Sequence, residues 1–451
     1  MKIMQGRNVT LPETFPLPDF PADFRWGVAT SSYQIEGAAA QDGRAPSIWD
    51  TFSKTPGKVV NGDTGDVACD HYNRLESDLD MIQSLGVDSY RFSIAWSRVQ
   101  PLGYGAWNTK GLDFYERLVD GLLKRGIAPF ATLYHWDLPQ GLQDLQLGWE
   151  ARDTAYRFAD YAERMGRLLG DRVASIATHN EPWCTATLGY DQGVFAPGKN
   201  DVPAMLRVSH HLLLSHGLAL QAMRAVGVKA PLGIVLNQSP TTAATDSPAD
   251  QARAQREYDR FVRWYMDPIF KKAYPQGPEL TQPVNIQDGD FDIIAQPLDF
   301  LGINYYTRIW ASTSTPPVAA PNKDGVSDMG WENYAQGLSD LLQGIHRDYT
   351  LPPIYITENG FAEADKVVDG RVNDPGRQAY MQTHLQALHE AMAAGVDVRG
   401  FFYWSLMDNF EWACGYDKRF GLVHVDYATQ HRTLKDSALR YRAFIASQRA
   451  R

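Results

Sequence analysis

Two glutamates stand at the ends of short apolar runs, each inside a cluster of polar and aromatic residues. Glu181 lies in NEPW at 180–183, and Glu358 lies in TENG at 357–360. An acid that protonates a leaving oxygen and a carboxylate that attacks an oxocarbenium-like centre together can hydrolyse a glycosidic bond. A single glutamate at such a place is usually solvated or salt-bridged. Two of them in similar surroundings weaken that explanation and indicate paired-carboxylate chemistry.

Eight short runs rich in β-branched and aromatic residues provide the elements that would position these groups. Helical patterns lie between them, and Leu75, Leu79, Ile82 and Leu85, for example, repeat at helical spacing before Gly86. Eight strands alternating with helices favour a parallel sheet, and eight is the number that closes a (β/α)₈ barrel. The runs are Phe24–Thr30, Val87–Ile94, Ile127–Tyr134, Val173–Thr178, Pro231–Leu236, Phe300–Tyr305, Ile354–Thr357 and Val398–Tyr403.

These runs end in hydrogen-bonding, ionisable or aromatic groups, and a barrel carries its active site at this carboxyl-terminal face. A chance distribution would place many such groups at the starts of the strands. Glu181 follows the fourth run and Glu358 the seventh, so we expect them to face each other across the barrel mouth. The other groups near the run ends are Gln34, Arg91, His135, Trp136, Asn180, Asn237, Asn304, Tyr306 and Trp404.

The length of 451 residues would allow two or three domains, but an α/β barrel with insertions can exceed about 400 residues as one domain. The sequence has no low-complexity linker, and no internal repeat beyond the β/α alternation. We therefore expect residues 1–451 to form one catalytic barrel domain, with residues 1–15 as an N-terminal arm. Long loops are predicted at 241–255 and 312–326.

Composition argues against several other classes of protein. A hydrophobic content of 44% and a charged content of 21% are ordinary for a globular chain. The net charge is −10 with both signs interspersed, so we expect no nucleic-acid partner. No apolar run of about 18 residues predicts a membrane span. Three widely spaced cysteines and the lack of a signal-peptide pattern favour a cytoplasmic protein, and no His or Cys grouping suggests a metal.

Several motifs, taken in order, resemble those of glycoside hydrolase family 1, the β-glucosidase family. THNEPW at 178–183 and ITENG at 356–360 look like the family's acid/base and nucleophile signatures. FRWGVATSSYQIEG at 24–37 resembles its N-terminal signature, and 90–98, 134–139, 301–306 and 403–412 also match. The resemblance covers roughly residues 15–445. It implies a (β/α)₈ fold, no cofactor, and hydrolysis with retention of configuration.

The resemblance gives the two glutamates different roles, with Glu358 as nucleophile and Glu181 as acid/base. Arg91 and Tyr306 match the family's partners for the nucleophile, and a cation and a hydrogen-bond donor favour its charged form. Glu181 is expected in a more apolar setting near Trp183, which would keep it protonated. A retaining mechanism also predicts that the two carboxyl groups lie about 5–5.5 Å apart.

Further positions match the family's substrate contacts. Asn180 is expected to hold the sugar 2-hydroxyl, Trp404 to form a stacking floor, and Trp331 to form a platform for the aglycone, the leaving group. The remaining candidates for substrate binding are Gln34, His135, Trp136, Asn304, Glu411, Trp412 and Phe420.

Glu411 also narrows the expected substrate. A carboxylate directed at O4 and O6 would repel a 6-phosphate, and the family's phosphoglycosidases have a basic, hydroxyl-bearing loop there. This chain has MDNFEW at 407–412, and Glu181 excludes the thioglucosidase variant, which carries glutamine. The expected enzyme is a β-glucosidase that acts on terminal non-reducing residues of cello-oligosaccharides and of aryl or alkyl β-glucosides. Some β-galactosidase, β-fucosidase and transglycosylation activity is also expected.

An alternative from another class is a non-catalytic sugar-binding relative. Its mark in the sequence would be the loss of one of the two glutamates, and both Glu181 and Glu358 are present. The expected partner is a β-glucoside or a short oligosaccharide, and the sequence leaves the aglycone and the oligomeric state open.

Overall fold

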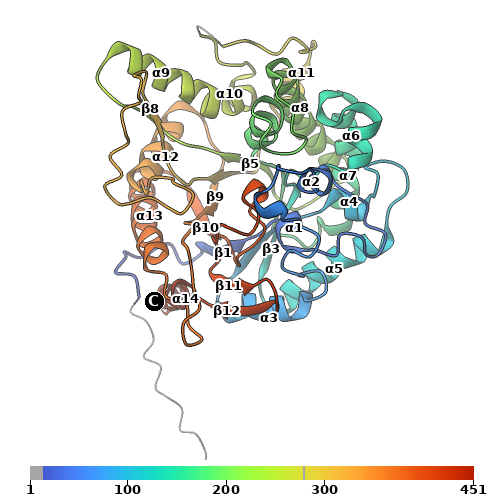
Figure 1. The fold of residues 1–451 in the computed structure, drawn as a ribbon. Helices are drawn as coiled ribbons and strands as arrows, with labels where there is room; N and C mark the ends of the chain where they lie inside the picture. Colours follow the sequence, from blue (N-terminus) through green and yellow to red (C-terminus); the bar gives the residue numbers. More distant parts are fainter. Residues whose placement is uncertain (1–13, 278–279, 451) are drawn as a thin grey trace, which may run out of the picture.

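The computed structural model describes residues 14–277 and 280–450, and its centre is a closed barrel of parallel strands surrounded by helices (Figure 1). The order around the barrel is β1-β10-β9-β7-β5-β4-β3-β2. All eight predicted runs form barrel strands, so the predicted (β/α)₈ fold is confirmed. Of the predicted arm, residues 1–13 lie outside the described residues. The barrel strands are β1 (Arg25–Ala29), β2 (Ser89–Ser93), β3 (Ala128–Tyr134), β4 (Ser175–Asn180), β5 (Leu232–Asn237), β7 (Phe300–Asn304), β9 (Ile354–Asn359) and β10 (Val398–Trp404).

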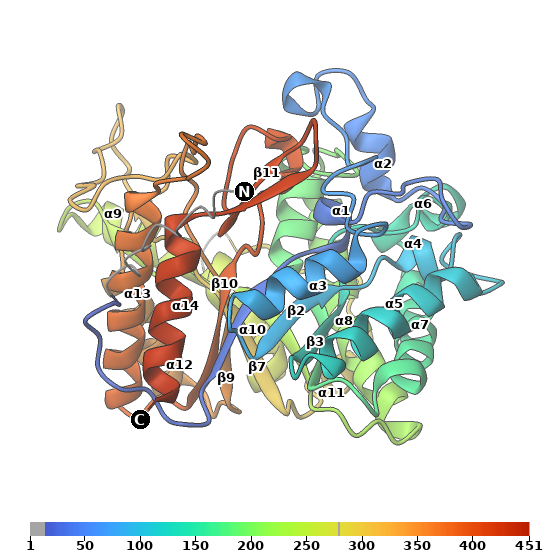
Figure 2. The same ribbon diagram turned by 90° about the horizontal axis from the view of Figure 1, so that it is seen from below.

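The helices cover the outside of the barrel, because their apolar residues repeat on one face. In α3, Leu75, Leu79 and Ile82 are buried at the predicted helical spacing. Figure 2 shows α2 and β11 near one end of the barrel and α11 at the other. The helices are α1 (Ser32–Ile35), α2 (Ile48–Ser53), α3 (Leu75–Ser84), α4 (Trp96–Val99), α5 (Thr109–Lys124), α6 (Gln140–Gln146), α7 (Asp153–Leu169), α8 (Val202–Ala225), α9 (Pro248–Tyr258), α10 (Trp264–Lys271), α11 (Asp290–Ile294), α12 (Gln336–Asp348), α13 (Pro375–Ala393) and α14 (Asp436–Arg449).

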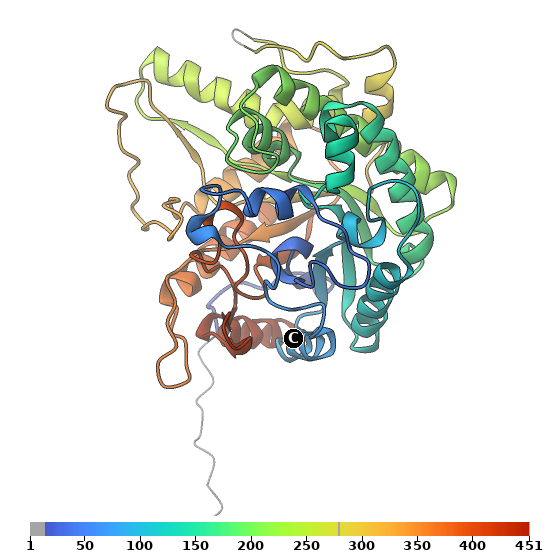
Figure 3. The same cartoon turned by 45° about the vertical axis from the view of Figure 1, so that its right-hand side comes forward.

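Two small sheets lie outside the barrel. β6 (Thr241–Ala243) pairs in parallel with β8 (Ile309–Ala311), and β11 (Val423–Asp426) pairs antiparallel with β12 (His431–Leu434). The prediction of a loop over 241–255 is therefore wrong, since β6 and the first turns of α9 lie there. Ser247 caps α9 by accepting a hydrogen bond from the Asp250 amide, and Pro248 follows it at the first helical turn. The predicted loop over 312–326 is confirmed, and it lies at the left edge of Figure 3.

Aromatic rings fill the interior of the barrel below its mouth. The ring of Phe402 lies 4.8 Å from that of Phe130, which in turn lies 5.5 Å from Tyr355. Gly27 leaves the room for Phe402, because a Cβ at that position would lie 2.4 Å from its ring. Trp404 stands two residues further along β10 and therefore faces the same side. The active-site face thus rests on a packed floor.

Irregular registers in β4 and β9 change which side chains point inward. Between β7 and β9, Ile303 pairs with Ile356 but Asn304 pairs with Glu358, so β9 holds one extra residue. Because of this β-bulge, Thr357 and Glu358 are consecutive residues that both make contacts on the inner face. A register shift also lies in β4 between Ala177 and Asn180. Both irregularities lie directly beside the two glutamates.

Candidate active site

A cavity of about 380 Å³ lies at the carboxyl ends of the barrel strands, a size within the roughly 300–1,000 Å³ of small-molecule sites. Most of the predicted site residues line it: His135, Trp136, Glu181, Asn304, Tyr306, Trp331, Glu358, Trp404, Glu411, Trp412 and Phe420. The other three, Gln34, Arg91 and Asn180, lie behind the wall and hydrogen-bond to residues that line it. The structure therefore brings all the predicted residues to one place.

Glu358 ends up between a cation and a hydroxyl group. Arg91 donates from Nη1 to Glu358 Oε1 at 2.7 Å, and the Tyr306 hydroxyl donates to Oε2 at 2.6 Å. All three side chains reach the site from different strands or strand ends. Burial raises the pKa of Glu358, whereas the charge of Arg91 and the hydrogen bond from Tyr306 oppose that rise. Both oxygens of Glu358 are thus held by donors that favour its anionic form.

Glu181 has neutral partners instead. Its Oε1 accepts from Asn304 Nδ2 at 2.6 Å, and its Oε2 accepts from the Cys184 thiol at 3.0 Å. Burial raises the pKa of Glu181 to about 8, and the nearby charge of Glu358 adds to the rise. The apolar environment expected near Trp183 is therefore only part of the cause, although Trp183 does line the cavity. A buried carboxyl group with this pKa is protonated at neutral pH.

Asn304 connects the two glutamates. The strands of the two glutamates do not lie directly across the barrel as predicted, because β4 and β9 are separated only by β5 and β7 and so are three places apart in a ring of eight. Asn304 at the end of β7 donates to Glu181, and its Oδ1 accepts from the Thr357 hydroxyl at 2.6 Å. One of the two strands between the glutamates therefore links Glu181 to the residue next to Glu358.

Asn180 lies below the cavity beside Arg91. Its Oδ1 accepts from Arg91 Nη2 at 2.6 Å and from Asn304 Nδ2 at 3.0 Å, while its Nδ2 faces His135 Nε2 at 3.1 Å. Burial lowers the pKa of His135 well below its usual value, so the ring is neutral. Among the described residues, His135 Nδ1 has no hydrogen-bond partner. A buried polar atom without a partner at the edge of a cavity is a candidate for binding a hydroxyl group.

Gln34 supports the segment that carries Glu411. Its Nε2 lies 2.9 Å from Asn409 Oδ1, 2.8 Å from the Phe410 carbonyl and 3.3 Å from Glu411 Oε2. Its Oε1 accepts from the Ser31 hydroxyl at 2.6 Å. Burial raises the pKa of Glu411 to about 8, with a further contribution from the charge of Glu358. The cavity therefore holds three carboxyl groups within electrostatic reach of one another, of which Glu181 and Glu358 are buried and Glu411 is half-buried.

Aromatic side chains make up most of the remaining wall. His135 stacks between Trp404 and Trp412, with ring centroids 5.7 Å and 6.0 Å away. Trp136 lies 4.6 Å from Trp412, and its indole nitrogen donates to the Asn180 carbonyl at 2.9 Å. On the other side, Trp331 lies 5.4 Å from Tyr306 and 6.0 Å from Phe420. Such faces can stack on the apolar side of a pyranose ring.

Sequence reasoning missed three residues that hold this site. Cys184 lies one helical turn after Glu181 and contacts it. The spacing of three residues between them is visible in the sequence and could have indicated this contact. Thr357 orients Asn304 only because of the bulge in β9. Tyr380 of α13 donates to the Tyr306 carbonyl at 2.9 Å and lies 3.0 Å from Asn359 Nδ2, behind Glu358, and no local signal marks it.

Three further features of the described chain are its cysteines, its clusters of possible metal ligands and the apolar character of its helices. All three cysteines are free. In residues 14–277 and 280–450, no cluster of three or more His, Cys, Asp and Glu side chains has the arrangement of a metal site. Over the same residues, none of the helices combines the length and the apolar character needed to cross a bilayer.

Comparisons with known proteins agree with this geometry. A β-glucosidase of Agrobacterium sp. is 47% identical over 437 residues, which cover 94% of this chain and 95% of that protein. A bifunctional β-D-glucosidase/β-D-fucosidase of Bifidobacterium breve is 45% identical over 464 residues, with 96% and 99% covered. The structure of SghA, a virulence factor of Agrobacterium tumefaciens, with its substrate analogue salicin superposes with a TM-score of 0.91 at 47% identity, covering 95% of this chain and 96% of that one.

The sequence pattern of the family described as glycosyl hydrolase family 1 matches residues 18–450, nearly the whole chain. The closed barrel, the paired glutamates and these relatives all lead to the same assignment. The chain belongs to glycosyl hydrolase family 1.

Proposed function

We propose that this protein is a retaining β-glucosidase in which Glu358 is the nucleophile and Glu181 the acid/base. One observation carries the proposal. Two buried glutamates share a cavity, and one is bound by a cation and a hydroxyl while the other has only an amide and a thiol. Environments that separate the proton affinities of two carboxyl groups suit one to act as a base or nucleophile and the other as an acid.

In the first step, a Glu358 oxygen forms a bond to the anomeric carbon while the bond to the leaving oxygen breaks. Glu181 gives its proton to that oxygen, so the aglycone leaves as a neutral alcohol. Arg91 and Tyr306 hold Glu358 in its attacking, anionic form. A carboxyl separation of about 5–5.5 Å stays part of this proposal.

In the second step, Glu181 takes a proton from water, which attacks the anomeric carbon as the bond to Glu358 breaks. The electrostatics favour this change of role. The charge of Glu358 contributes to the raised pKa of Glu181, and that charge disappears when the ester forms. The pKa of Glu181 then falls, so the carboxylate that gave its proton to the aglycone stays ionised and can accept a proton from water. A second alcohol in place of water would give transglycosylation.

The sugar would lie against Trp404 with its hydroxyl groups directed at the polar wall. His135 Nδ1 supports this placement because it has no partner within the described residues. Asn180 has one amide hydrogen beyond its contact with His135, and we assign that hydrogen to the 2-hydroxyl. Glu411, held by Gln34, would bind O4 and O6. The other proposed contacts are Trp136, Asn304, Trp412 and Phe420, with Trp331 on the aglycone side.

The relatives support this substrate class. Two of them are named for β-glucosidase activity, one with β-fucosidase activity as well, and SghA was solved with its substrate analogue salicin. We therefore propose terminal β-glucosyl residues of cello-oligosaccharides and of aryl or alkyl glucosides as substrates, with β-fucosides and β-galactosides as secondary ones. A cytoplasmic location, a part in breaking down cellulose-derived sugars, and one catalytic domain over residues 1–451 complete the proposal.

The test replaces each glutamate in turn. Glu358→Ala should lower turnover of a β-glucoside on the order of 10⁴-fold or more, and added azide should restore part of it by forming the α-glycosyl azide. Glu181→Ala should harm substrates with poor leaving groups far more than activated aryl glycosides. If Glu358→Ala kept nearly wild-type activity, Glu358 would not be the nucleophile. A wild type that binds glucosides without cleaving them would favour a non-catalytic sugar-binding protein.

A further inference from the structure

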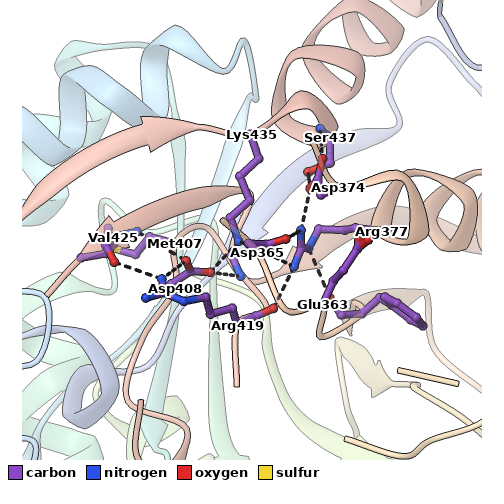
Figure 4. Close-up of polar contacts among 12 residues, drawn as sticks. Glu363, Asp365, Asp374, Arg377, Met407, Asp408, Arg419, Val425, Lys435 and Ser437 are labelled. Carbon is purple, nitrogen blue, oxygen red and sulfur yellow. Dashed lines mark hydrogen bonds and ion pairs between the residues drawn. The ribbon is translucent and has the colours of Figure 1, made fainter. Parts of the chain in front are cut away.

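A cluster of six charged side chains lies behind the segment that carries Glu411. Figure 4 shows it between β11–β12, the start of α13 and the start of α14. Three acids and three bases balance each other, and all but Arg419 have fully buried side chains. We call it the six-charge cluster, and its members are Asp365, Asp374, Arg377, Asp408, Arg419 and Lys435.

Asp408 is the member that joins the cluster to the sugar end of the site. Its Oδ1 accepts from the Gly421 amide at 3.0 Å and from Lys435 Nζ at 2.7 Å. Its Oδ2 accepts from Arg419 Nη1 at 2.6 Å and from the Val425 amide at 3.4 Å. One carboxylate therefore ties the segment after β10 to residues 419–425, on either side of Phe420.

The same segment carries the proposed sugar contacts. Asn409 directly follows Asp408 and accepts from Gln34 Nε2, and Glu411 lies two residues further on. Phe420, between Arg419 and Gly421, lines the cavity. Glu411 is three residues from Asp408, and the segments with Gln34 and Phe420 are each joined to Asp408 or its neighbour by a hydrogen bond. A displacement of the Asp408 backbone would therefore move all three side chains.

The cluster also reaches the loop that follows the strand carrying Glu358. Lys435 bridges Asp408 and Asp365, and Arg377 pairs with Asp365 at 3.0 Å. Arg377 in addition donates to the Phe361 carbonyl at 3.2 Å and to the Arg419 carbonyl at 2.8 Å. Phe361 lies three residues after Glu358. The loops that follow β9 and β10 therefore share one buried set of ion pairs.

Stability alone is a weak reason for such a cluster. Removing charges from water is costly, and apolar residues of similar size often stabilise a core equally well or better. Buried ion pairs nevertheless fix directions and distances that apolar packing leaves adjustable. Burial raises the pKa of Asp408, but the charges of Lys435 and Arg419 outweigh burial and bring it below the usual value, so the carboxylate stays charged.

We propose that Asp408, held by Lys435 and Arg419, is a positioning residue that sets where Glu411 and Phe420 meet the sugar. The proposal rests on the proposed β-glucosidase function. It predicts that recognition of the hydroxymethyl group at C6 depends on the cluster, while the cleavage chemistry does not.

The experiment compares Asp408→Asn with Asp290→Asn as a matched control. Asp290 is also a buried carboxylate, and it pairs with Arg152 and His210 at the start of α11, at the other end of the barrel (Figure 2). For each variant, kcat/KM is measured on an aryl β-glucoside and on the aryl β-xyloside, which lacks C6. We expect Asp408→Asn to lower the glucoside-to-xyloside ratio about tenfold, toward the ratio of Glu411→Gln, whereas Asp290→Asn leaves it unchanged.

An unchanged glucoside-to-xyloside ratio in folded Asp408→Asn would overturn the proposal. A merely structural role would lower kcat/KM equally on both substrates and leave the ratio as it is. Hydrogen exchange on the wild-type enzyme gives a second measurement that needs no variant. The amides of Asp408, Gly421 and Val425 should be strongly protected without any sugar, and rapid exchange there would also overturn the proposal. Failure of the function itself would look different, since the wild type would then cleave neither glycoside.

Discussion

The two ends of the cavity are built in different ways. At the end proposed to bind the sugar, Gln34, Asn180 and Glu411 belong to a network of side-chain hydrogen bonds, and the six-charge cluster lies behind the segment that carries Glu411. At the end proposed to face the aglycone, apolar side chains dominate the wall: Trp183, Phe261, Ile309, Met329 and Trp331. Directional polar groups reject a sugar of the wrong shape strongly, whereas apolar walls discriminate weakly.

The aglycone end also has more space around it. A second cavity of about 500 Å³ adjoins the first and shares Trp183, Phe261 and Ile309 with it. Trp183 and Phe261 pack with their ring centroids 4.6 Å apart, between the two spaces. This difference between the two ends predicts strict selection of the sugar and tolerant selection of the leaving group.

The largest effect should come from breaking the sugar end. Glu411→Ala removes the hydrogen-bonding group proposed for O4 and O6, and we expect kcat/KM on a β-glucoside to fall roughly 10²-fold, as for two lost hydrogen bonds. The ratio between two aglycones on the same sugar should stay unchanged. A shift in that ratio would show that Glu411 does not act on the sugar alone.

The next prediction concerns the charges at the sugar end. Only protonated Glu181 can act as the acid, so kcat/KM of the wild type should fall as the pH rises through about 8. Glu358→Gln removes a neighbouring negative charge, which makes ionisation of Glu181 easier and should lower its pKa by about one unit or more. A carbon-13 NMR titration of Glu181 measures this shift. An unchanged or raised pKa would contradict the coupling between the two glutamates.

A change at the aglycone end should have a smaller and more selective effect. Trp331→Ala removes one aromatic face from the wall, and we expect KM for an aryl glucoside to rise about tenfold, while that for methyl glucoside changes little. The pH at which activity falls should stay where it is in the wild type. Equal losses on both glucosides would mean that Trp331 supports the sugar site instead.

The smallest predicted effect tests Cys184, which lies between the two regions. Its thiol donates to Glu181 Oε2, which stabilises the ionised form. Cys184→Ala should therefore raise the pKa of Glu181 slightly and move the alkaline fall in activity to higher pH, with a change in rate of about two- to threefold. Cys184→Ser keeps a donor and serves as the control. A move to lower pH in the alanine variant would contradict this role.

Much of the fold could be read from the chain, because its signals are local. Runs rich in β-branched and aromatic residues predicted the eight strands, and the polar groups after them predicted the face of the site, since parallel strands bring their carboxyl ends to one side. The same reasoning failed at 241–255, where a polar composition concealed β6 and the start of α9.

By itself, the sequence determined the fold class, the face of the barrel that carries the cavity, and the two glutamates that line it. Only the tertiary structure decided how those residues meet. The bulge in β9 that turns Glu358 inward, the bridge through Asn304 and the six-charge cluster all depend on pairs distant in sequence. Arg91 and Glu358, for instance, are 267 positions apart. Such contacts leave no periodic mark on the chain, because only the three-dimensional path of the closed barrel brings their partners together.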